Sequence, residues 1–413
     1  MPSPFAARRH RLGTLMDIGD LAVIATSPQR RIPGPDSADP WPDFHFLTGL
    51  DHPGCGLILE KPNTGPLRER LFIPNPADTL WNGSLPPSLP ATSAISEISP
   101  FHLFEPALRS LAFSARRILV FTGGNPFAPD SDDPWLASLC ARLLPAHRID
   151  RLAPLLGRLR AVKSNADLDA IRAAATSAAS AMRRAAASIK PGIRGCDLKA
   201  EFLHAIHHRG SRGPGCPILT ASGPESLTLH WHGDRRPADP GDLILFDATA
   251  EHDRWHADLT RSFPASGTFS PLQLTAHDAV HRTLSAAIAS LKPGRLLSDC
   301  HHDTLLFLQH ELLRCGLLPA SDVPDPSLIS PAIRRICPHR IFHHIGMEVH
   351  DPVPDSEPLA QGAALAVEPG ILLPSAGFGL RLEETIALSP DGPEILTASM
   401  PSSAPDIEAL LRF

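Results

Sequence analysis

The chain has 413 residues, of which 43% are hydrophobic and 20% are charged, as in a folded globular protein with a substantial core. A formal charge of −6 gives no electrostatic reason to expect nucleic acid or an anionic membrane as a partner. No apolar run approaches the roughly 18 residues that a membrane-spanning helix needs. The length favours two domains over a single core.

The seven cysteines are scattered along the chain, and no pair has the spacing of a zinc knuckle. We therefore interpret them as reduced thiols. Residues 1–13 carry arginines without a following apolar core, so they do not resemble a signal peptide. The location expected from these features is the cytoplasm.

Residues 1–157 alternate short apolar runs with proline-rich loops, a pattern that favours an α/β domain. Strands are predicted at 55–60 and 118–121. The stretches 28–42 and 84–100 are predicted to be loops, because proline is excluded from the interiors of helices and sheets.

A boundary is expected at Gly157, so that residues 158–413 form a second domain. Its first helix is predicted to begin at a capping box, with Ser164 as the N-cap and Asp167 three residues later. Helices are predicted at 167–189, 196–208 and 272–291, and strands at 241–249, 256–264, 363–367 and 379–388. This pattern predicts an α+β fold, with an antiparallel sheet and helices on one of its faces.

Two aspartates stand in the first two of these strands, which are separated by the polar run 250–255. A hairpin centred near residues 252–253 would place Asp247 opposite Asp258, with Cβ atoms about 4.5–5.5 Å apart on one face. Two carboxylates that close repel each other, so either one is protonated or a cation lies between them. The hairpin is therefore a candidate cation site.

Further ligating groups follow downstream. Residues 339–351 supply several imidazoles, and Glu368 ends an apolar strand. The stretch 380–385 reads as one strand, with Arg381 and Glu383 on the same face. Because a buried carboxylate without a partner is costly, these acidic residues indicate a shared ligand.

The order Asp, Asp, His, Glu, Glu on a hairpin, a loop and strands resembles that of the pita-bread metallopeptidases, which include methionine aminopeptidase, prolidase, creatinase and aminopeptidase P. The resemblance runs from about residue 158 to residue 388 and is specific, because five ligands recur in order with their strand context. The matching stretches are Asp247-Ala-Thr, Asp258-Leu-Thr-Arg, His343-His-Ile-Gly-Met-Glu-Val-His, Val367-Glu-Pro-Gly and Leu380-Arg-Leu-Glu.

Within that family, the aminopeptidase P branch is the most similar. Residues 222–231 resemble its substrate-side histidine segment, and the stretches 8–12, 42–50 and 79–83 resemble parts of the N-terminal domain of bacterial aminopeptidase P. The resemblance implies a pita-bread catalytic domain at 158–413, preceded by a smaller α/β domain at 1–157.

Two departures from the family pattern stand out. Thr249 occupies a position where the family usually has a small residue, often glycine. The hairpin tip, residues 251–256, is also unusually rich in histidine and charge. Either departure could alter metal preference or substrate access.

The resemblance implies a dinuclear metal centre in which Asp258 and Glu383 bridge two divalent ions. Oxygen-rich ligation with a single imidazole and no thiolate favours Mn²⁺, with Co²⁺ or Zn²⁺ as alternatives. The implied metal ligands are Asp247, Asp258, His343, Glu368 and Glu383.

The same resemblance gives roles to neighbouring groups. Glu368 would act as the general base. Three histidines, His230, His339 and His350, would donate hydrogen bonds to the tetrahedral oxyanion. Arg381 would orient a ligating carboxylate.

Other residues are open to a simpler interpretation. Trp81 would wall the pocket of a neighbouring subunit or merely pack, and Asp43 would bind a peptide amine or merely be solvated. The remaining histidine clusters are interpreted as solvated faces, because no carboxylate or thiolate accompanies them. They comprise His204, His207, His208, His301, His302 and His310.

The predicted function is hydrolysis of the N-terminal Xaa-Pro peptide bond by a metal-bridged hydroxide. The expected partners are peptides with proline as the second residue, and the family implies a homo-oligomer, either a dimer or a tetramer. Three alternatives stay open. One is a prolidase restricted to Xaa-Pro dipeptides, one is a creatinase-like C–N hydrolase, and one is a catalytically silent scaffold.

Overall fold

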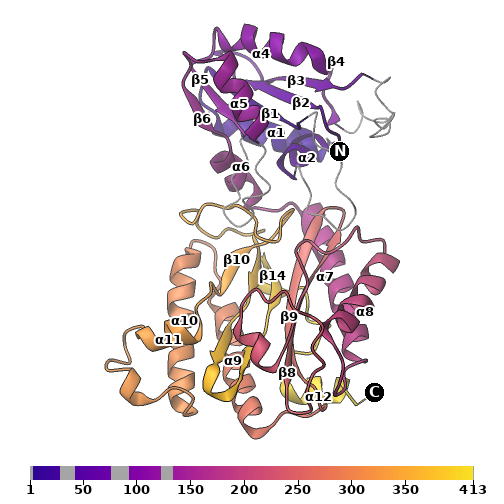
Figure 1. Ribbon diagram of the computed structural model, residues 1–413. Helices are drawn as coiled ribbons and strands as arrows, with labels where there is room; N and C mark the ends of the chain where they lie inside the picture. The colour runs from indigo at the N-terminus through magenta and orange to yellow at the C-terminus, as the bar shows by residue number, and fades with distance from the viewer. Residues whose placement is uncertain (1–2, 28–41, 76–92, 122–133, 413) are drawn as a thin grey trace. The chain divides into compact units, whose positions relative to one another are not determined.

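The computed structural model describes residues 3–27, 42–75, 93–121 and 134–412. These residues form two compact units, shown in Figure 1. The first unit contains the described residues up to Arg160 together with Pro352–Pro354, and the second contains the rest. Gly157 lies inside helix α6 (Ala153–Arg160). The division after Gly157 stays a prediction about the folding domains.

The N-terminal unit is built on a six-stranded mixed sheet in the order β4-β3-β2-β1-β5-β6. Helices α4 (Phe104–Ala112) and α5 (Pro134–Leu143) pack against it in an apolar core that includes Ile58 and Leu139. Two more helices, α1 (Pro4–Leu15) and α2 (Pro42–Thr48), belong to the same unit. The strands are β1 (Asp20–Ala25), β2 (Gly56–Glu60), β3 (Arg68–Ile73), β4 (Glu97–Pro100), β5 (Arg117–Val120) and β6 (Ile149–Arg151).

This unit has the predicted α/β character. The predicted strands at 55–60 and 118–121 correspond to β2 and β5. Most of the two predicted loops lies outside the described residues, although the second of them ends in strand β4.

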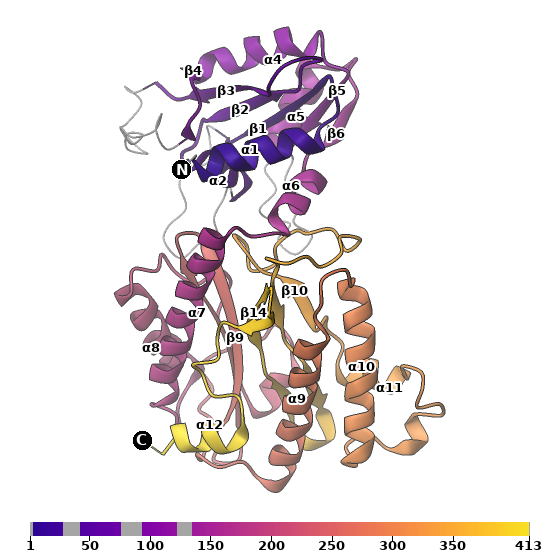
Figure 2. The ribbon, with the colours of Figure 1, turned by 180° about the vertical axis from the view of Figure 1, so that it is seen from behind.

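The second unit contains three antiparallel sheets, with strand orders β7-β8-β9, β10-β11-β14-β15 and β12-β13. Figures 1 and 2 show helices α7 and α8 along one flank of the strands and α9 and α10 along the other. The helices are α7 (Asn165–Ala186), α8 (Gly195–His208), α9 (Pro271–Ser290), α10 (Leu297–Arg314), α11 (Pro331–Ile336) and α12 (Ala404–Leu410). The strands are β7 (Leu219–Ser222), β8 (Leu243–His252), β9 (Trp255–Pro264), β10 (Phe342–His344), β11 (Ala364–Val367), β12 (Gly370–Leu373), β13 (Phe378–Arg381), β14 (Glu384–Ser389) and β15 (Gly392–Ile395).

Helix α7 begins where the sequence predicts. The Ser164 side chain accepts a hydrogen bond from the Asp167 backbone N–H, and the Asp167 carboxylate accepts one from the Ser164 N–H. This capping box satisfies two backbone donors that a helix start leaves unpaired. The helix ends at Ala186, three residues before the predicted end at Ile189.

The β8–β9 hairpin differs from the predicted register. Asp253 and Arg254 both have positive φ, at 47° and 70°, so they form the two central residues of the turn. The turn is therefore centred one residue later than expected. Asp247 pairs with Thr260, and Asp258 pairs with Thr249. A shift of two in the pairing keeps the same faces, so the two aspartates are diagonal neighbours on one face.

The stretch 379–388 is also not one strand. Strand β13 ends at Arg381 and pairs with β12, whereas β14 begins at Glu384 and pairs with β11. Leu382 and Glu383 lie at the crossover between two sheets. Arg381 and Glu383 therefore do not lie on one face of a single strand, as the sequence predicted. The ladder of backbone hydrogen bonds is interrupted at Glu383.

Candidate metal centre

Four acidic and imidazole side chains from distant parts of the second unit converge on one point. The ligand atoms of Asp258, His343 and Glu383 all lie within 4.8 Å of one another. Glu368, which follows β11, joins them. The His343 Nε2 atom lies 3.6 Å from Glu368 Oε1, 3.9 Å from Glu383 Oε1 and 4.0 Å from Asp258 Oδ2.

The hydrogen bonding of His343 fixes which atom it presents to these carboxylates. Its Nδ1 atom lies 3.1 Å from the His344 backbone carbonyl, which can only accept, so Nδ1 carries the proton. Burial lowers the pKa of His343 to about 4, so the ring is neutral near pH 7. Its Nε2 lone pair therefore faces three carboxylate groups, an arrangement that favours either a proton or a cation between them.

The properties of the carboxylates also fit a bound cation. Burial, followed by mutual repulsion, raises the pKa of Asp258 and of Glu383 well above their usual values. Burial also raises the pKa of Glu368 to about 7. The Oε1 atom of Glu383 is buried and has no hydrogen-bond partner among the described residues. A buried acceptor left unpaired in this way fits a metal ligand.

Asp247 is connected to the cluster through Arg381. The Arg381 Nη2 atom donates to Asp247 Oδ2, and its Nε atom lies 3.7 Å from Glu368 Oε2. Burial opposes the charge of Arg381, but the surrounding carboxylates, Asp247 and Glu368 first, raise its pKa above the usual range. Arg381 thus holds two of the predicted ligands and offsets part of their charge.

Hydroxyl groups that the sequence analysis did not single out join β9 to the crossover. The Thr260 hydroxyl donates to Glu383 Oε2 at 2.6 Å, which leaves Oε1 to face the cluster. The Ser262 hydroxyl accepts from the Arg381 N–H, and the Thr385 hydroxyl accepts from the Asp258 N–H. These contacts replace the missing ladder at the break between β13 and β14. Of these three residues only Thr260 lies in a stretch that resembles the family pattern, and its bond to Glu383 does not follow from the sequence.

The three predicted substrate-side histidines occupy different environments. The His350 ring lies 4.4 Å from the His343 ring, centroid to centroid, and burial lowers its pKa to about 3. His230 is exposed, and it is close enough to His350 to influence that pKa. His339 Nε2 lies 3.0 Å from the backbone carbonyl of Glu368, so its Nε2 proton is already used. His339 therefore differs from the other two in what it can donate.

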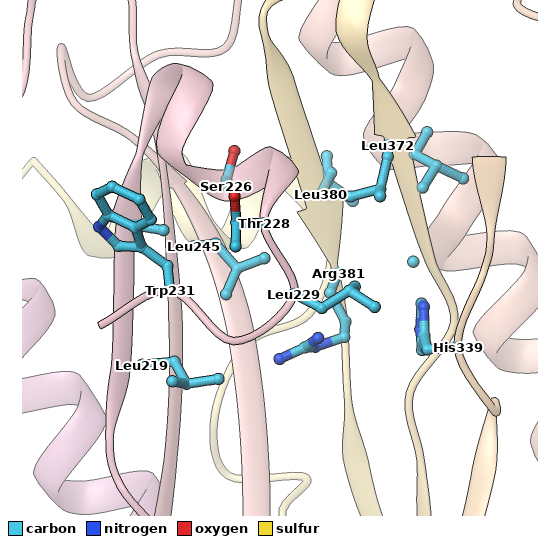
Figure 3. Close-up of a pocket in the computed structure, with 13 residues that line it drawn as sticks. Leu219, Ser226, Thr228, Leu229, Trp231, Leu245, His339, Leu372, Leu380 and Arg381 are labelled. Carbon is cyan, nitrogen blue, oxygen red and sulfur yellow. The ribbon is translucent and has the colours of Figure 1, made fainter. Parts of the chain in front are cut away.

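Figure 3 shows a mostly apolar pocket that is lined in part by His339 and Arg381. His339 and Arg381 form part of its wall, which links the pocket to the metal centre. Most of the other lining side chains are apolar, and they include Leu219, Leu229, Trp231, Leu245, Leu372 and Leu380. These side chains form a mostly apolar wall beside His339 and Arg381.

Thr249 has a definite structural role. It is fully buried opposite Asp258, and its hydroxyl accepts from the backbone N–H groups of Gly215 and Cys216 at 2.7 and 3.3 Å. The loop before β7 is thereby hydrogen-bonded to the hairpin face that carries Asp247 and Asp258. At the tip, His256 Nδ1 lies 3.3 Å from the Gly346 carbonyl.

The residues for which the sequence left two interpretations have different surroundings in the structure. Asp43 is buried and bonded to Arg160 at 2.9 Å, so its carboxylate already has a cationic partner. Trp81 lies outside the described residues. Five of the six clustered histidines are exposed, and His301 is half-buried and accepts from the Ile341 N–H.

A buried ion pair anchors the loop that carries His350. Lys163 Nζ donates to Asp351 Oδ2 at 3.1 Å, and neither side chain is exposed. The Asp351 N–H in turn donates to the His344 carbonyl.

We expect Lys163→Met to lower the free energy of unfolding by about 3–5 kcal/mol, because it leaves a buried carboxylate without its cation. Urea denaturation of the metal-free protein measures this. The matched control is Arg340→Met, which breaks the exposed Arg340–Asp355 pair and is expected to cost less than about 1 kcal/mol. Equal effects of the two substitutions would contradict the anchoring role.

Comparison with known proteins decides the family. The description "Metallopeptidase family M24" matches residues 169–390, which is more than half of the chain. The chain belongs to metallopeptidase family M24. A second description, "Aminopeptidase P, N-terminal domain", matches residues 5–120 of this M24 peptidase. The α+β pita-bread fold expected from the sequence is therefore confirmed.

Named relatives cover nearly the whole chain. This M24 peptidase is 27% identical over 435 residues to the Xaa-Pro aminopeptidase of Escherichia coli, with 98% of this chain and 97% of the relative covered. It is 27% identical over 387 residues to Xaa-Pro aminopeptidase 3 of Mus musculus, which covers 89% of this chain and 76% of the relative.

Solved structures agree. Zinc-substituted E. coli aminopeptidase P in complex with product is 25% identical, with a TM-score of 0.85, and the match covers 99% of this chain and 98% of that one. Proline aminopeptidase P II from Yersinia pestis is 26% identical, with a TM-score of 0.83 and 99% of both chains covered. Among the described residues, none of the helices is long and apolar enough to cross a membrane.

Proposed function

We propose that this M24 peptidase is a two-metal Xaa-Pro aminopeptidase that works with Mn²⁺. The observation that carries the proposal is the His343 Nε2 lone pair directed at three carboxylates, one of which has an unpaired buried oxygen. The two relatives described above are both named Xaa-Pro aminopeptidases, which supports the choice of substrate.

The proposed ligands divide between two ions. Asp247 would hold one ion, His343 and Glu368 would hold the other, and Asp258 and Glu383 would bridge them. Four carboxylates offset the charge of two divalent ions, and the oxygen-rich set favours Mn²⁺ over softer metals. When bound, such a pair of ions supplies a Lewis acid for the peptide carbonyl and makes a water molecule acidic near pH 7.

The side chains of the site would move the protons. As the general base, the Glu368 carboxylate would accept a proton from the attacking water and pass it to the leaving nitrogen. His350 and His230 would donate hydrogen bonds to the carbonyl oxygen as its negative charge develops.

We infer a role for His339 that differs from the predicted one. Burial lowers its pKa to about 4, so near pH 7 the ring carries a single proton, and that proton is bonded to the Glu368 carbonyl. We therefore infer that His339 fixes the backbone at Glu368 instead of donating to the oxyanion.

The chemistry of proline explains why the site needs an apolar wall. A bond that precedes proline has no N–H, and the ring fixes its backbone, so recognition must rely on the ring surface. The pocket beside His339 and Arg381 offers such a surface next to the reacting groups (Figure 3).

The test uses purified protein with Mn²⁺ and three substrates: an Xaa-Pro-Xaa tripeptide, its Xaa-Pro dipeptide and a proline-free tripeptide. We expect release of the N-terminal residue from the first, and at least a hundredfold loss of rate in Glu368→Gln, which removes the base. Cleavage of the dipeptide alone would indicate a prolidase. Bound Mn²⁺ without cleavage of any peptide would contradict the proposal, and absence of Mn²⁺ binding would favour a silent scaffold.

The proposal includes two further expectations, on the oligomeric state and on the cellular location. Light scattering coupled to size-exclusion chromatography tests the expected dimer or tetramer, and cell fractionation tests the expected cytoplasmic location.

A further inference from the structure

The proposed function assigns no role to one buried cation, Arg261, close to the proposed metal centre. Arg261 is in β9, next to Thr260, and its side chain is fully buried. Adjacent strand residues point to opposite faces, so Arg261 points away from the face that carries Asp258. It donates to the carbonyls of Glu383 (2.6 Å), Thr260 (3.0 Å), Met400 (2.8 Å) and Pro401 (2.6 Å), and to Glu384 Oε1 (2.6 Å).

One of these acceptors belongs to a proposed metal ligand. Glu383 lies at the crossover between β13 and β14, so no strand ladder holds its carbonyl. Arg261 binds that carbonyl, the Glu383 N–H donates to the Thr260 carbonyl, and the Thr260 hydroxyl binds the Glu383 side chain. The position of the Glu383 carboxylate is therefore set by two consecutive residues of β9.

The other end of the Arg261 network is the segment 396–401, which precedes α12. The Leu396 N–H donates to the Thr385 carbonyl at 2.9 Å. The Thr397 hydroxyl accepts from the Thr385 N–H at 3.1 Å and donates to the Glu384 carboxylate. Glu384 is in turn the ion-pair partner of Arg261, and each of these side chains is buried. The segment thus reaches the metal centre through Glu384 and Arg261.

We propose that Arg261 is a positioning residue that couples segment 396–401 to Glu383, so that this segment helps to set the metal affinity of the centre. The proposal rests on the metal centre of the proposed function but not on the choice of an Xaa-Pro substrate. A buried guanidinium is costly unless every donor is used, and here its donors hold the backbone of a metal ligand together with a distant segment.

The competing explanation is that Arg261 only stabilises the fold. Measurements of metal affinity and of stability distinguish the positioning role from a purely structural one. Mutation of a residue that contacts a metal ligand typically lowers metal affinity by 10–100-fold. The variants are Arg261→Met and the milder Thr397→Val, which keeps the size of the side chain and removes its hydroxyl. Thr397→Ser restores the hydroxyl. Ile206→Ala, at a fully buried apolar position of α8, is the control for destabilisation alone.

Metal-free proteins are first characterised by thermal unfolding. Mn²⁺ affinity is then measured by calorimetry, at a temperature where all variants are folded. We expect Arg261→Met and Thr397→Val to weaken binding of at least one Mn²⁺ by about tenfold or more, and Thr397→Ser to bind nearly as the wild type. Ile206→Ala should lower the melting temperature and leave the affinity unchanged.

Unchanged affinity in Thr397→Val, or an equal loss in Ile206→Ala, would overturn the positioning role. A wild-type protein that binds Mn²⁺ but leaves Xaa-Pro peptides intact would contradict the proposed activity and leave this inference standing. The two failures are therefore distinguishable.

Discussion

Asp258→Asn is expected to abolish tight metal binding and, in the same protein, to stabilise the metal-free form. Asp258 provides one of the oxygens that surround His343 Nε2, and burial and neighbouring acids raise its pKa well above the usual value. An asparagine keeps the shape but removes a charge that the metal-free protein accommodates poorly. The expected result is a higher free energy of unfolding of the metal-free form near neutral pH.

Activity should change in the opposite direction. Metal ions contribute several kcal/mol to stabilisation of the transition state, which corresponds to a loss of about a thousandfold or more in kcat/KM. Metal content after dialysis, peptide hydrolysis and thermal unfolding in EDTA measure the three effects. Asp253→Asn is the control, because Asp253 is exposed at the tip of the same hairpin. Wild-type metal content in Asp258→Asn, or a lower melting temperature of its metal-free form, would argue against this account.

The sequence predicts much of the site because the proposed ligands lie on strand faces and at the ends of strands, and both can be recognised from the sequence pattern. Asp247 and Asp258 share a face in the structure although their predicted pairing was wrong, since a slip of two residues preserves the face. The structure also brings His343, Glu368 and Glu383 together, from β10, the end of β11 and the crossover before β14. Their roles as metal ligands stay predictions until a metal is measured.

The missed features depend on tertiary contacts between ordinary residues. The alternation in 379–388 fits a single strand, and only the pairing of its two halves with different sheets reveals the break at Glu383. Thr260 and Arg261 stand in a stretch that resembles the family pattern, yet no sequence spacing shows that each contacts Glu383, more than a hundred positions away. The inferred role of His339 likewise depends on a bond to the Glu368 backbone that no sequence spacing shows.

Mn²⁺ affinity is expected to fall steeply below about pH 7. The metal-free protein keeps a proton on Glu368 up to about pH 7, and that proton must leave before the carboxylate can bind an ion. Each displaced proton reduces the apparent affinity about tenfold for every pH unit below the pKa. Calorimetry in buffers of different ionisation enthalpy should show proton uptake by the buffer. An affinity that is independent of pH between about pH 5 and 8 would contradict a proton on the ligands.

The proton on Glu368 should also affect the stability of the metal-free protein. Its effect on stability has the opposite pH dependence to its effect on metal affinity. In the unfolded chain Glu368 loses its proton near its ordinary pKa of 4.5, whereas in the folded protein it keeps the proton to about pH 7. Between these values the folded state binds more protons, so the contribution of Glu368 to stability falls as the pH rises. The total loss is on the order of 3 kcal/mol.

Buried histidines have the opposite effect on the pH dependence of stability. The contribution of Glu368 must therefore be measured as the difference between the wild type and a variant. Burial lowers the pKa of His343 to about 4 and that of His350 to about 3, and such groups reduce stability as the pH falls below about 6.5. These histidines are present in both wild type and Glu368→Gln, so the difference between the two isolates Glu368. We expect Glu368→Gln in EDTA to become progressively more stable than the wild type as the pH rises from about 5 to 7. A constant difference across this range would mean that Glu368 is already ionised in the metal-free protein, and that its proton does not compete with the metal.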